Sequence, residues 1–314
     1  MPGISELMEK KWGLVLAGGG GKGAYQVGAY KAIVEAGLDK NIVAMSGSSV
    51  GTLNMALFGM DDIDMAQSVW KSISPNQFLE IELEKMFDGK EGFISRDGLL
   101  NIIDGYVNRD KLKNETRPMY ATLSRYIDMV TEEAVSEYAK INQLDFETVK
   151  SVLLASSALP FVYEPVKIGN YIYRDGGLTD NLPIKPLYDE GIRDFIVIML
   201  SPNTKIRYDK FPGANFFEIR PSRDLGDIIS GTLDFSSKGA NIRMDMGYAE
   251  TKRYIRYYND ADFSSATFKI KMMEMADEEY RQFCNKYKVD AIGSYIDNSV
   301  SSVSAYFDKY DIDL

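Results

Sequence analysis

The sequence predicts an α/β fold, a three-layer sandwich around a mainly parallel central sheet. A short apolar run at 12–17 leads into the glycine-rich segment 18–23 and then into a helical pattern that ends at Gly37, which indicates a buried strand, a turn and a helix. The same order recurs at 42–57, where the turn is rich in Gly and Ser. Strands that alternate with helices in this way are typical of parallel sheets.

Local patterns place the remaining elements. Further strands are expected at 120–126, 166–168, 171–173, 195–200 and 216–219, and a further helix at 146–154. The pair at 166–173 is expected to be a hairpin, because a two-residue turn that begins with glycine separates two alternating runs.

We expect one domain at 1–258. Within it, 61–118 has helical spacing interrupted by polar residues, and is expected to be a helical insertion that packs beside the sheet. Residues 259–314 also have helical spacing and are expected to form a C-terminal extension packed on the same domain.

The composition excludes several kinds of chemistry. The 314-residue chain has no histidine, one cysteine and a formal net charge of −10. Ser-His-Asp and Cys-His sites, His-ligated metal centres and disulfide frameworks therefore cannot form. The acidic charge disfavours binding to nucleic acid, which needs a basic face. No apolar run approaches the roughly 20 residues of a transmembrane helix, and we expect a cytoplasmic protein that can associate peripherally with a membrane.

The first chemically informative motif is Gly-x-Ser-x-Gly at 47–51, with Ser49 at its centre and Gly47 and Gly51 on either side. A nucleophilic serine needs a sharp turn between a strand and a helix, and flanking glycines permit that turn. The amino terminus of the helix adds unpaired N–H groups near the serine oxygen. A plain Gly/Ser-rich turn is the alternative.

The second motif is the glycine-rich loop 18–23, and three interpretations of it compete. Its N–H groups could bind the oxyanion of a tetrahedral intermediate. It also fits the dinucleotide pattern Gly-x-Gly-x-x-Gly, with Glu35 or Asp39 as the downstream acid, which would make the chain a nucleotide-binding regulatory domain. A tight turn without a ligand is the third interpretation.

The third motif is Asp175-Gly176-Gly177, which directly follows the strand at 171–173. A serine nucleophile in a chain without histidine needs another base, and a carboxylate at a rigid turn can serve. Because an aspartate at its ordinary pKa is a weak base, partial burial should make it a better one. Asp180 and Asp194 are its competitors nearby in the sequence.

Together, these three motifs resemble the patatin-like phospholipase family. The segment Leu-Ala-Ser-Ser-Ala-Leu-Pro at 154–160 is similar to that family's Ala-Ser-x-Ala-x-Pro, and Asn-Leu-Pro at 181–183 to its Asn-x-Pro. The resemblance covers about 11–200 and continues more weakly to 248.

The resemblance implies a lipid acyl hydrolase of the phospholipase A or lysophospholipase type, with Ser49 as nucleophile and Asp175 as base. It implies an oxyanion hole and motif support from the following residues: Gly19, Gly20, Gly21, Gly47, Gly51, Gly176 and Lys22. We expect a phospholipid or other acyl-lipid substrate at a membrane or micelle surface, with neither a metal ion nor a cofactor. An inactive relative that serves as an interaction module is a further alternative.

Two details stay open at this point. Lys22 stands where the family often has Arg, and it could bind a lipid headgroup or hold the loop through a hydrogen bond. Phe93, Ile94 and Leu99 are candidates for contact with a lipid groove, and ordinary core packing is the alternative for all three.

Overall fold

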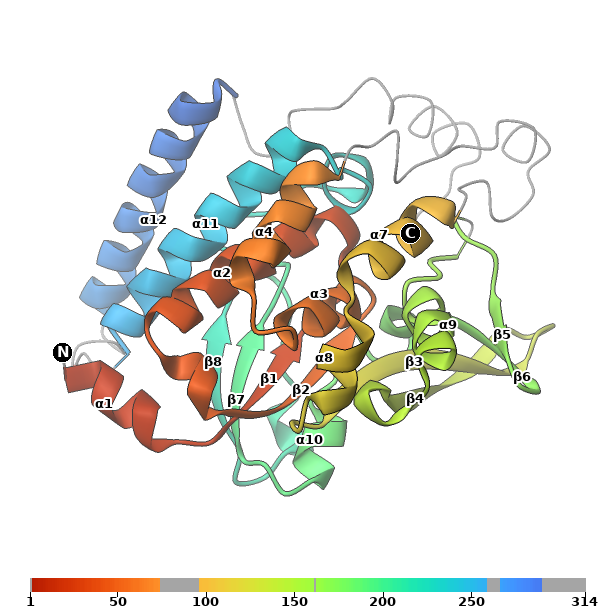
Figure 1. Ribbon diagram of the computed structural model, residues 1–314. Helices are drawn as coiled ribbons and strands as arrows, with labels where there is room; N and C mark the ends of the chain where they lie inside the picture. Colours follow the sequence, from red (N-terminus) through yellow and green to blue (C-terminus); the bar gives the residue numbers. More distant parts are fainter. Residues whose placement is uncertain (1, 74–95, 161, 259–265, 290–314) are drawn as a thin grey trace.

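The computed structural model describes residues 2–73, 96–160, 162–258 and 266–289. Within these residues, eight strands form one sheet in the order β5-β6-β3-β2-β1-β7-β8, with β4 paired to β3 outside that path (Figure 1). The strands are β1 Trp12–Leu16, β2 Ile42–Ser48, β3 Met119–Asp128, β4 Glu133–Lys140, β5 Val166–Ile168, β6 Tyr171–Asp175, β7 Asp194–Ile198 and β8 Asn215–Ile219.

The sheet has a parallel part and an antiparallel part. Strands β3, β2, β1, β7 and β8 pair in parallel. Strands β4 and β6 pair antiparallel to β3, and β5 pairs antiparallel to β6. The predicted α/β class with a mainly parallel central sheet is therefore confirmed.

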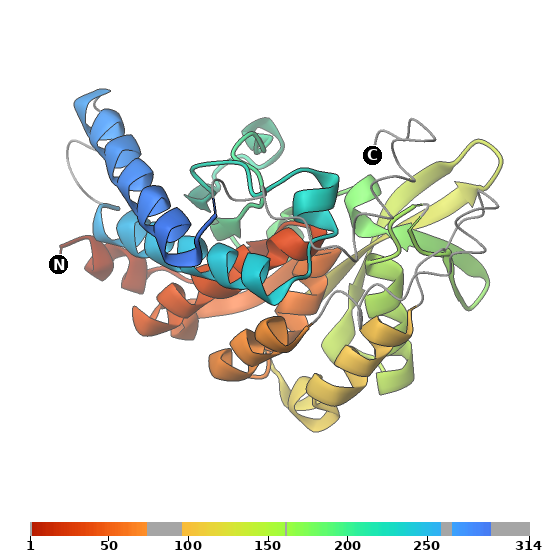
Figure 2. The same ribbon diagram turned by 90° about the horizontal axis from the view of Figure 1, so that it is seen from above.

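Helices cover the sheet unequally (Figures 1 and 2). The helices are α1 Pro2–Glu9, α2 Ala24–Glu35, α3 Val50–Phe58, α4 Ile63–Ser72, α7 Asp97–Tyr106, α8 Arg109–Asn114, α9 Phe146–Ser156, α10 Lys185–Asp189, α11 Ser237–Arg256 and α12 Ala266–Tyr287. Figure 1 shows α2, α3, α4 and α11 over one face and α10 below the other.

Alternation along the central strands explains these two layers. In β1, Leu14 and Leu16 point into the large core under α2 and α3, whereas Val15 points into a smaller core on the opposite face. In β7, Phe195 and Val197 join Val15 on the smaller side. Both faces of the central strands are therefore buried, as their nearly continuous apolar sequence predicts.

Two elements did not follow from the sequence patterns. Strand β4 has no apolar run, because it is half-exposed and depends on its pairing with β3. Helix α11 packs along α2, far from it in the sequence, through a face of mixed polar and apolar residues. Of the expected insertion, the described residues form α4, α7 and α8, and Phe93 and Ile94 lie outside the described residues.

Candidate active site

Two strands end at neighbouring positions on one edge of β3. β2 runs parallel to β3, with Ser48 opposite Thr122. β6 arrives from the opposite direction, with Asp175 opposite Leu123. β4 occupies the other edge of β3 over 120–128, so β2 and β6 share the remaining edge. The residues that end β2 and β6 are thereby brought together.

Ser49 occupies the sharp turn between β2 and α3. Its φ is 52° and its ψ −127°, a backbone conformation that residues other than glycine rarely adopt. Such conformations cluster at functional sites. The turn is tight, because a Cβ on Gly47 would lie 2.4 Å from the Gly51 carbonyl oxygen. The Ser49 N–H donates to Ser156 Oγ at 3.1 Å, which ties the turn to the end of α9.

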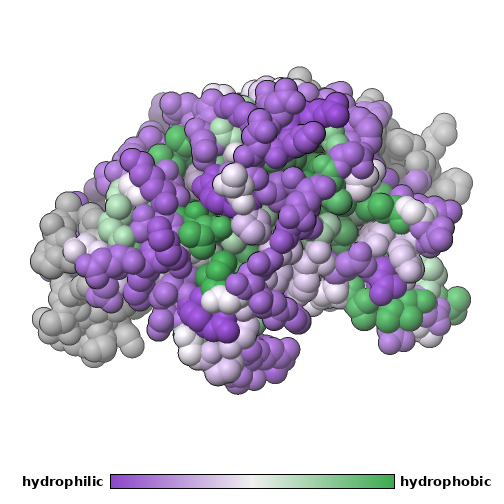
Figure 3. Space-filling view, turned by 60° about the horizontal axis from the view of Figure 1, so that its bottom comes forward, coloured by the Kyte–Doolittle hydropathy of each residue, from purple (hydrophilic) through white to green (hydrophobic). Residues whose placement is uncertain are grey.

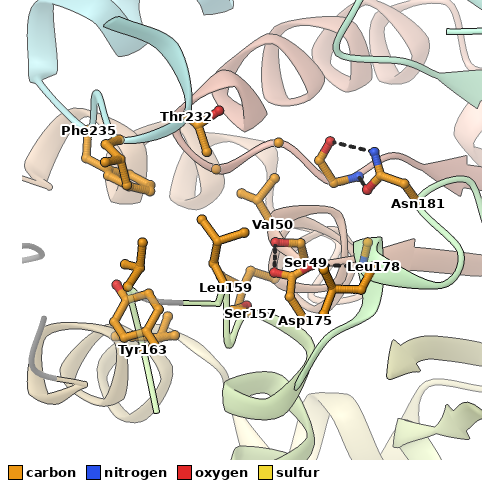
Figure 4. Close-up of a pocket in the computed structure, with 18 residues that line it drawn as sticks. Ser49, Val50, Ser157, Leu159, Tyr163, Asp175, Leu178, Asn181, Thr232 and Phe235 are labelled. Carbon is orange, nitrogen blue, oxygen red and sulfur yellow. Dashed lines mark hydrogen bonds between the residues drawn. The ribbon is translucent and has the colours of Figure 1, made fainter. Parts of the chain in front are cut away.

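The Ser49 hydroxyl faces Asp175 directly. Ser49 Oγ donates to Asp175 Oδ2 at 2.7 Å, as the dashed line in Figure 4 shows. The other carboxylate oxygen, Oδ1, accepts from the Gly177 N–H at 2.8 Å. One oxygen therefore fixes the carboxylate to its own turn and leaves the other for the serine.

Burial makes Asp175 a stronger base than an ordinary aspartate. The residue is 3% exposed, and this burial raises its pKa to about 6, although hydrogen bonds from Ser49 and the Gly177 N–H partly lower it. The competing aspartates are engaged elsewhere: Asp180 accepts from Tyr138 Oη at 2.6 Å, and Asp194 pairs with Lys10 at 3.3 Å.

The glycine-rich loop borders the same space. Gly19 and Gly20 line the cavity that contains Ser49. Within the described residues, no hydrogen-bond acceptor is found for the N–H groups of Gly19 and Gly20. Gly21 packs against the loop at 231–234, where a Cβ would lie 2.1 Å from the Asp234 carbonyl oxygen. The loop thus has free donors beside the serine.

Asn181 holds this loop in place, although the sequence motifs predicted no role for it. Its Oδ1 accepts from the Gly18 N–H at 3.1 Å, and its Nδ2 donates to the Gly18 carbonyl at 3.4 Å. Ser156 is a second such residue, through its contact with the Ser49 N–H. The sequence pointed to these two residues only because Ser156 lies in the family-like segment 154–160 and Asn181 in the segment 181–183.

The geometry does not support the dinucleotide interpretation. The loop lies at the carboxyl ends of the strands, whereas Glu35 is at the far end of α2 and Asp39 lies before β2 begins. Glu35 also pairs with Lys31 at 2.8 Å. A dinucleotide site needs the acid near the pyrophosphate loop, at the same edge of the sheet.

A mostly apolar cavity of ≈ 260 Å³ opens beside Ser49 (Figure 4). Its large apolar and aromatic lining residues are Val50, Leu53, Leu99, Leu159, Val162, Tyr163, Leu178, Leu233 and Phe235. Leu99, one of the candidate groove residues, both lines the cavity and belongs to the core. Figure 4 shows Tyr163 and Phe235 on the far side of the cavity from Ser49 and Asp175. The shape suits a hydrocarbon chain that extends away from the serine.

Lys22 contacts the segment that follows β8. Its ammonium lies 3.9 Å from Asp224 Oδ1, and a Cβ on Gly231 would lie 2.5 Å from its Cε. Burial lowers its pKa, although Asp224 opposes this effect. These contacts support the loop-holding role for Lys22.

Comparisons with known proteins show the family of the chain. The sequence model of the patatin-like phospholipase family matches residues 14–188. The chain is similar to "Lysophospholipase NTE1" of Cryptococcus neoformans, with 27% identity over 72% of this chain and 12% of that protein. It is 27% identical to an uncharacterised NTE family protein of Mycobacterium tuberculosis over 54% of this chain and 27% of that protein. The chain therefore spans only a small part of these relatives.

Among solved structures, VipD from Legionella pneumophila aligns with a TM-score of 0.46 and 14% identity, over 96% of this chain and 79% of VipD. None of the described helices is long and apolar enough to cross a membrane.

Replacing Asp175 with Asn should stabilise the protein at neutral pH. Because the pKa of Asp175 rises from 3.8 to about 6, the ionised carboxylate disfavours the folded state by about 3 kcal/mol. This penalty is absent below pH 3.8, grows as the pH rises and is complete above about pH 6. Chemical unfolding of wild type and Asp175→Asn at about pH 4 and pH 7.5 should show a larger advantage of the variant at the higher pH. An advantage that does not change with pH would contradict this account.

Proposed function

The chain belongs to the patatin-like phospholipase family, and on that premise we propose that it hydrolyses the carboxylic esters of lipids through Ser49 and Asp175. The observation that carries the proposal is the 2.7 Å hydrogen bond from Ser49 Oγ to Asp175 Oδ2, in a chain without histidine. The enzyme would be of the phospholipase A or lysophospholipase type.

In the first half of the proposed reaction, Ser49 Oγ attacks the ester carbonyl carbon while its proton passes to Asp175 Oδ2. The N–H groups of Gly19 and Gly20, which line the cavity, stabilise the oxyanion, and each such donor typically contributes about 3 kcal/mol. As the intermediate collapses, the carbon–oxygen bond to the alcohol breaks. Asp175 returns its proton to the leaving oxygen, and Ser49 keeps the acyl group.

In the second half, a water molecule attacks the acyl-enzyme and Asp175 accepts its proton. Ser49 Oγ then leaves with that proton, so the enzyme returns to its starting state. A base with a pKa of about 6 suits both halves, because it is ionised at neutral pH and still accepts a proton better than an exposed aspartate.

The apolar cavity supports an acyl-lipid substrate, since a hydrocarbon chain beside Ser49 would replace water along its walls. The substrate would be a phospholipid or lysophospholipid at a membrane or micelle surface. The name of the fungal relative supports the lysophospholipid, and neither a cofactor nor a metal ion has a step in the scheme.

Ser49→Ala should abolish the release of fatty acid from phosphatidylcholine and lysophosphatidylcholine. Loss of the nucleophile should lower kcat by at least about 1,000-fold. Ser48→Ala is the matched control, because Ser48 is in the same motif and its buried hydroxyl has no hydrogen-bond partner among the described residues. The control should keep most of the wild-type rate. A Ser49→Ala enzyme with near-normal turnover would refute the dyad and mean that another residue is the nucleophile. A wild-type protein that releases no fatty acid would favour the inactive module.

The pH dependence of kcat/KM should have an acid limb near pH 6. Asp175 must be ionised to accept the Ser49 proton, so activity rises as the pH passes through its pKa of about 6 and is lost below it. A soluble short-chain acyl ester is the right substrate, since it carries no ionising headgroup. A midpoint near pH 4 would mean that a more exposed carboxylate is the base.

A further inference from the structure

Strand β3 continues past the carboxyl end of β2, where the site lies. Its first four residues, 119–122, pair with β2, which ends at Ser48. Six more residues follow to Asp128, and because a strand rises about 3.3 Å per residue they extend about 20 Å further. The β3–β4 hairpin therefore projects from the same edge as Ser49 and the glycine-rich loop. Figures 1 and 2 both show it at one end of the molecule, beside the β5–β6 hairpin.

The tip of this hairpin is apolar and exposed. Ile127 is 56% exposed, Met129 48% and Val130 92%, although turn tips are ordinarily polar. Figure 3 shows a hydrophobic patch at the end of the molecule that carries the hairpin. These three residues, which we call the hairpin tip, leave much of their apolar surface in water.

Two further exposed side chains lie at the two ends of β6. Tyr171, at the start of β6, is 53% exposed and lies under the Arg125 guanidinium at 4.8 Å. Leu178 follows the end of β6, is 50% exposed and lines the cavity. Tyrosine and arginine are common where a protein meets the polar–apolar boundary of a membrane. Apolar surface is thus exposed both at the cavity and at the hairpin tip.

We propose that the hairpin tip inserts into the surface of a lipid membrane and presents the carboxyl edge of the sheet to its substrate. This inference rests on the proposed function, which supplies the reason for a membrane at this edge. Asp128, Glu132 and Glu133 are exposed around the tip, and the chain carries a net charge of −10. The preferred surface is therefore zwitterionic, because an anionic one would repel these carboxylates.

Vesicle sedimentation tests this proposal independently of catalysis. The full chain carrying Ser49→Ala is mixed with phosphatidylcholine vesicles, with and without phosphatidylserine. Adding Ile127→Ser, Met129→Ser and Val130→Ser should weaken binding to phosphatidylcholine at least about tenfold, because apolar burial is lost. Binding should be weaker to the vesicles with phosphatidylserine, and added salt should restore it.

The matched control is Ile270→Ser with Met273→Ser. These side chains are 58% and 68% exposed on α12, at the other end of the molecule, and their loss should not change vesicle binding. In the enzyme that retains Ser49, the tip substitutions should leave turnover of a soluble ester unchanged. This result separates the membrane proposal from the proposed function. Equal binding by the tip variant and the control, or no binding by the Ser49→Ala protein without tip substitutions, would overturn the proposal. So would a wild-type dimer that the tip substitutions dissociate, since the patch would then be a protein interface.

Discussion

The pairing of β3 with both β2 and β6 along one edge is the interaction on which the rest of the site depends. The two strands arrive from opposite directions and end opposite Thr122 and Leu123, so their last residues must meet. The junction is close: a Cβ on Gly176 would lie 2.3 Å from the Thr122 carbonyl oxygen and 3.0 Å from Ser48 Oγ. Glycine at that position lets the chain leave β6 without pushing the two strand ends apart.

Reactivity in this site is obtained at the expense of stability. The fold keeps a non-glycine residue, Ser49, at a φ of 52° and buries a carboxylate whose pKa rises to about 6. The loop beside the glycine-rich segment is held by buried polar contacts. The Arg243–Asp234 ion pair is almost completely buried at 2.9 Å, and Arg243 also donates to the carbonyl oxygens of Leu225 and Ser230. These bonds fix the loop that packs over the glycine-rich segment.

Much of this site could be predicted because its signals are local. The turn at Ser49, the glycine-rich loop and Asp175 can each be identified from a motif of a few residues. The absence of histidine favoured a carboxylate as the base. What could not be predicted depends on distant pairing. The sequence around β4 has no apolar pattern, and the clamp from Asn181 to Gly18 joins residues 163 positions apart. The exposure of Val130 also depends on how far the β3–β4 hairpin extends past β2.

The central claim is that Asp175 activates Ser49, and covalent labelling with a fluorophosphonate tests it most directly. Peptide mapping should find one adduct, on Ser49. The labelling rate should fall as the pH drops through about 6 and should be far lower in Asp175→Asn, because the serine then has no base. An adduct on a different serine, or an Asp175→Asn protein labelled at the wild-type rate, would contradict the account.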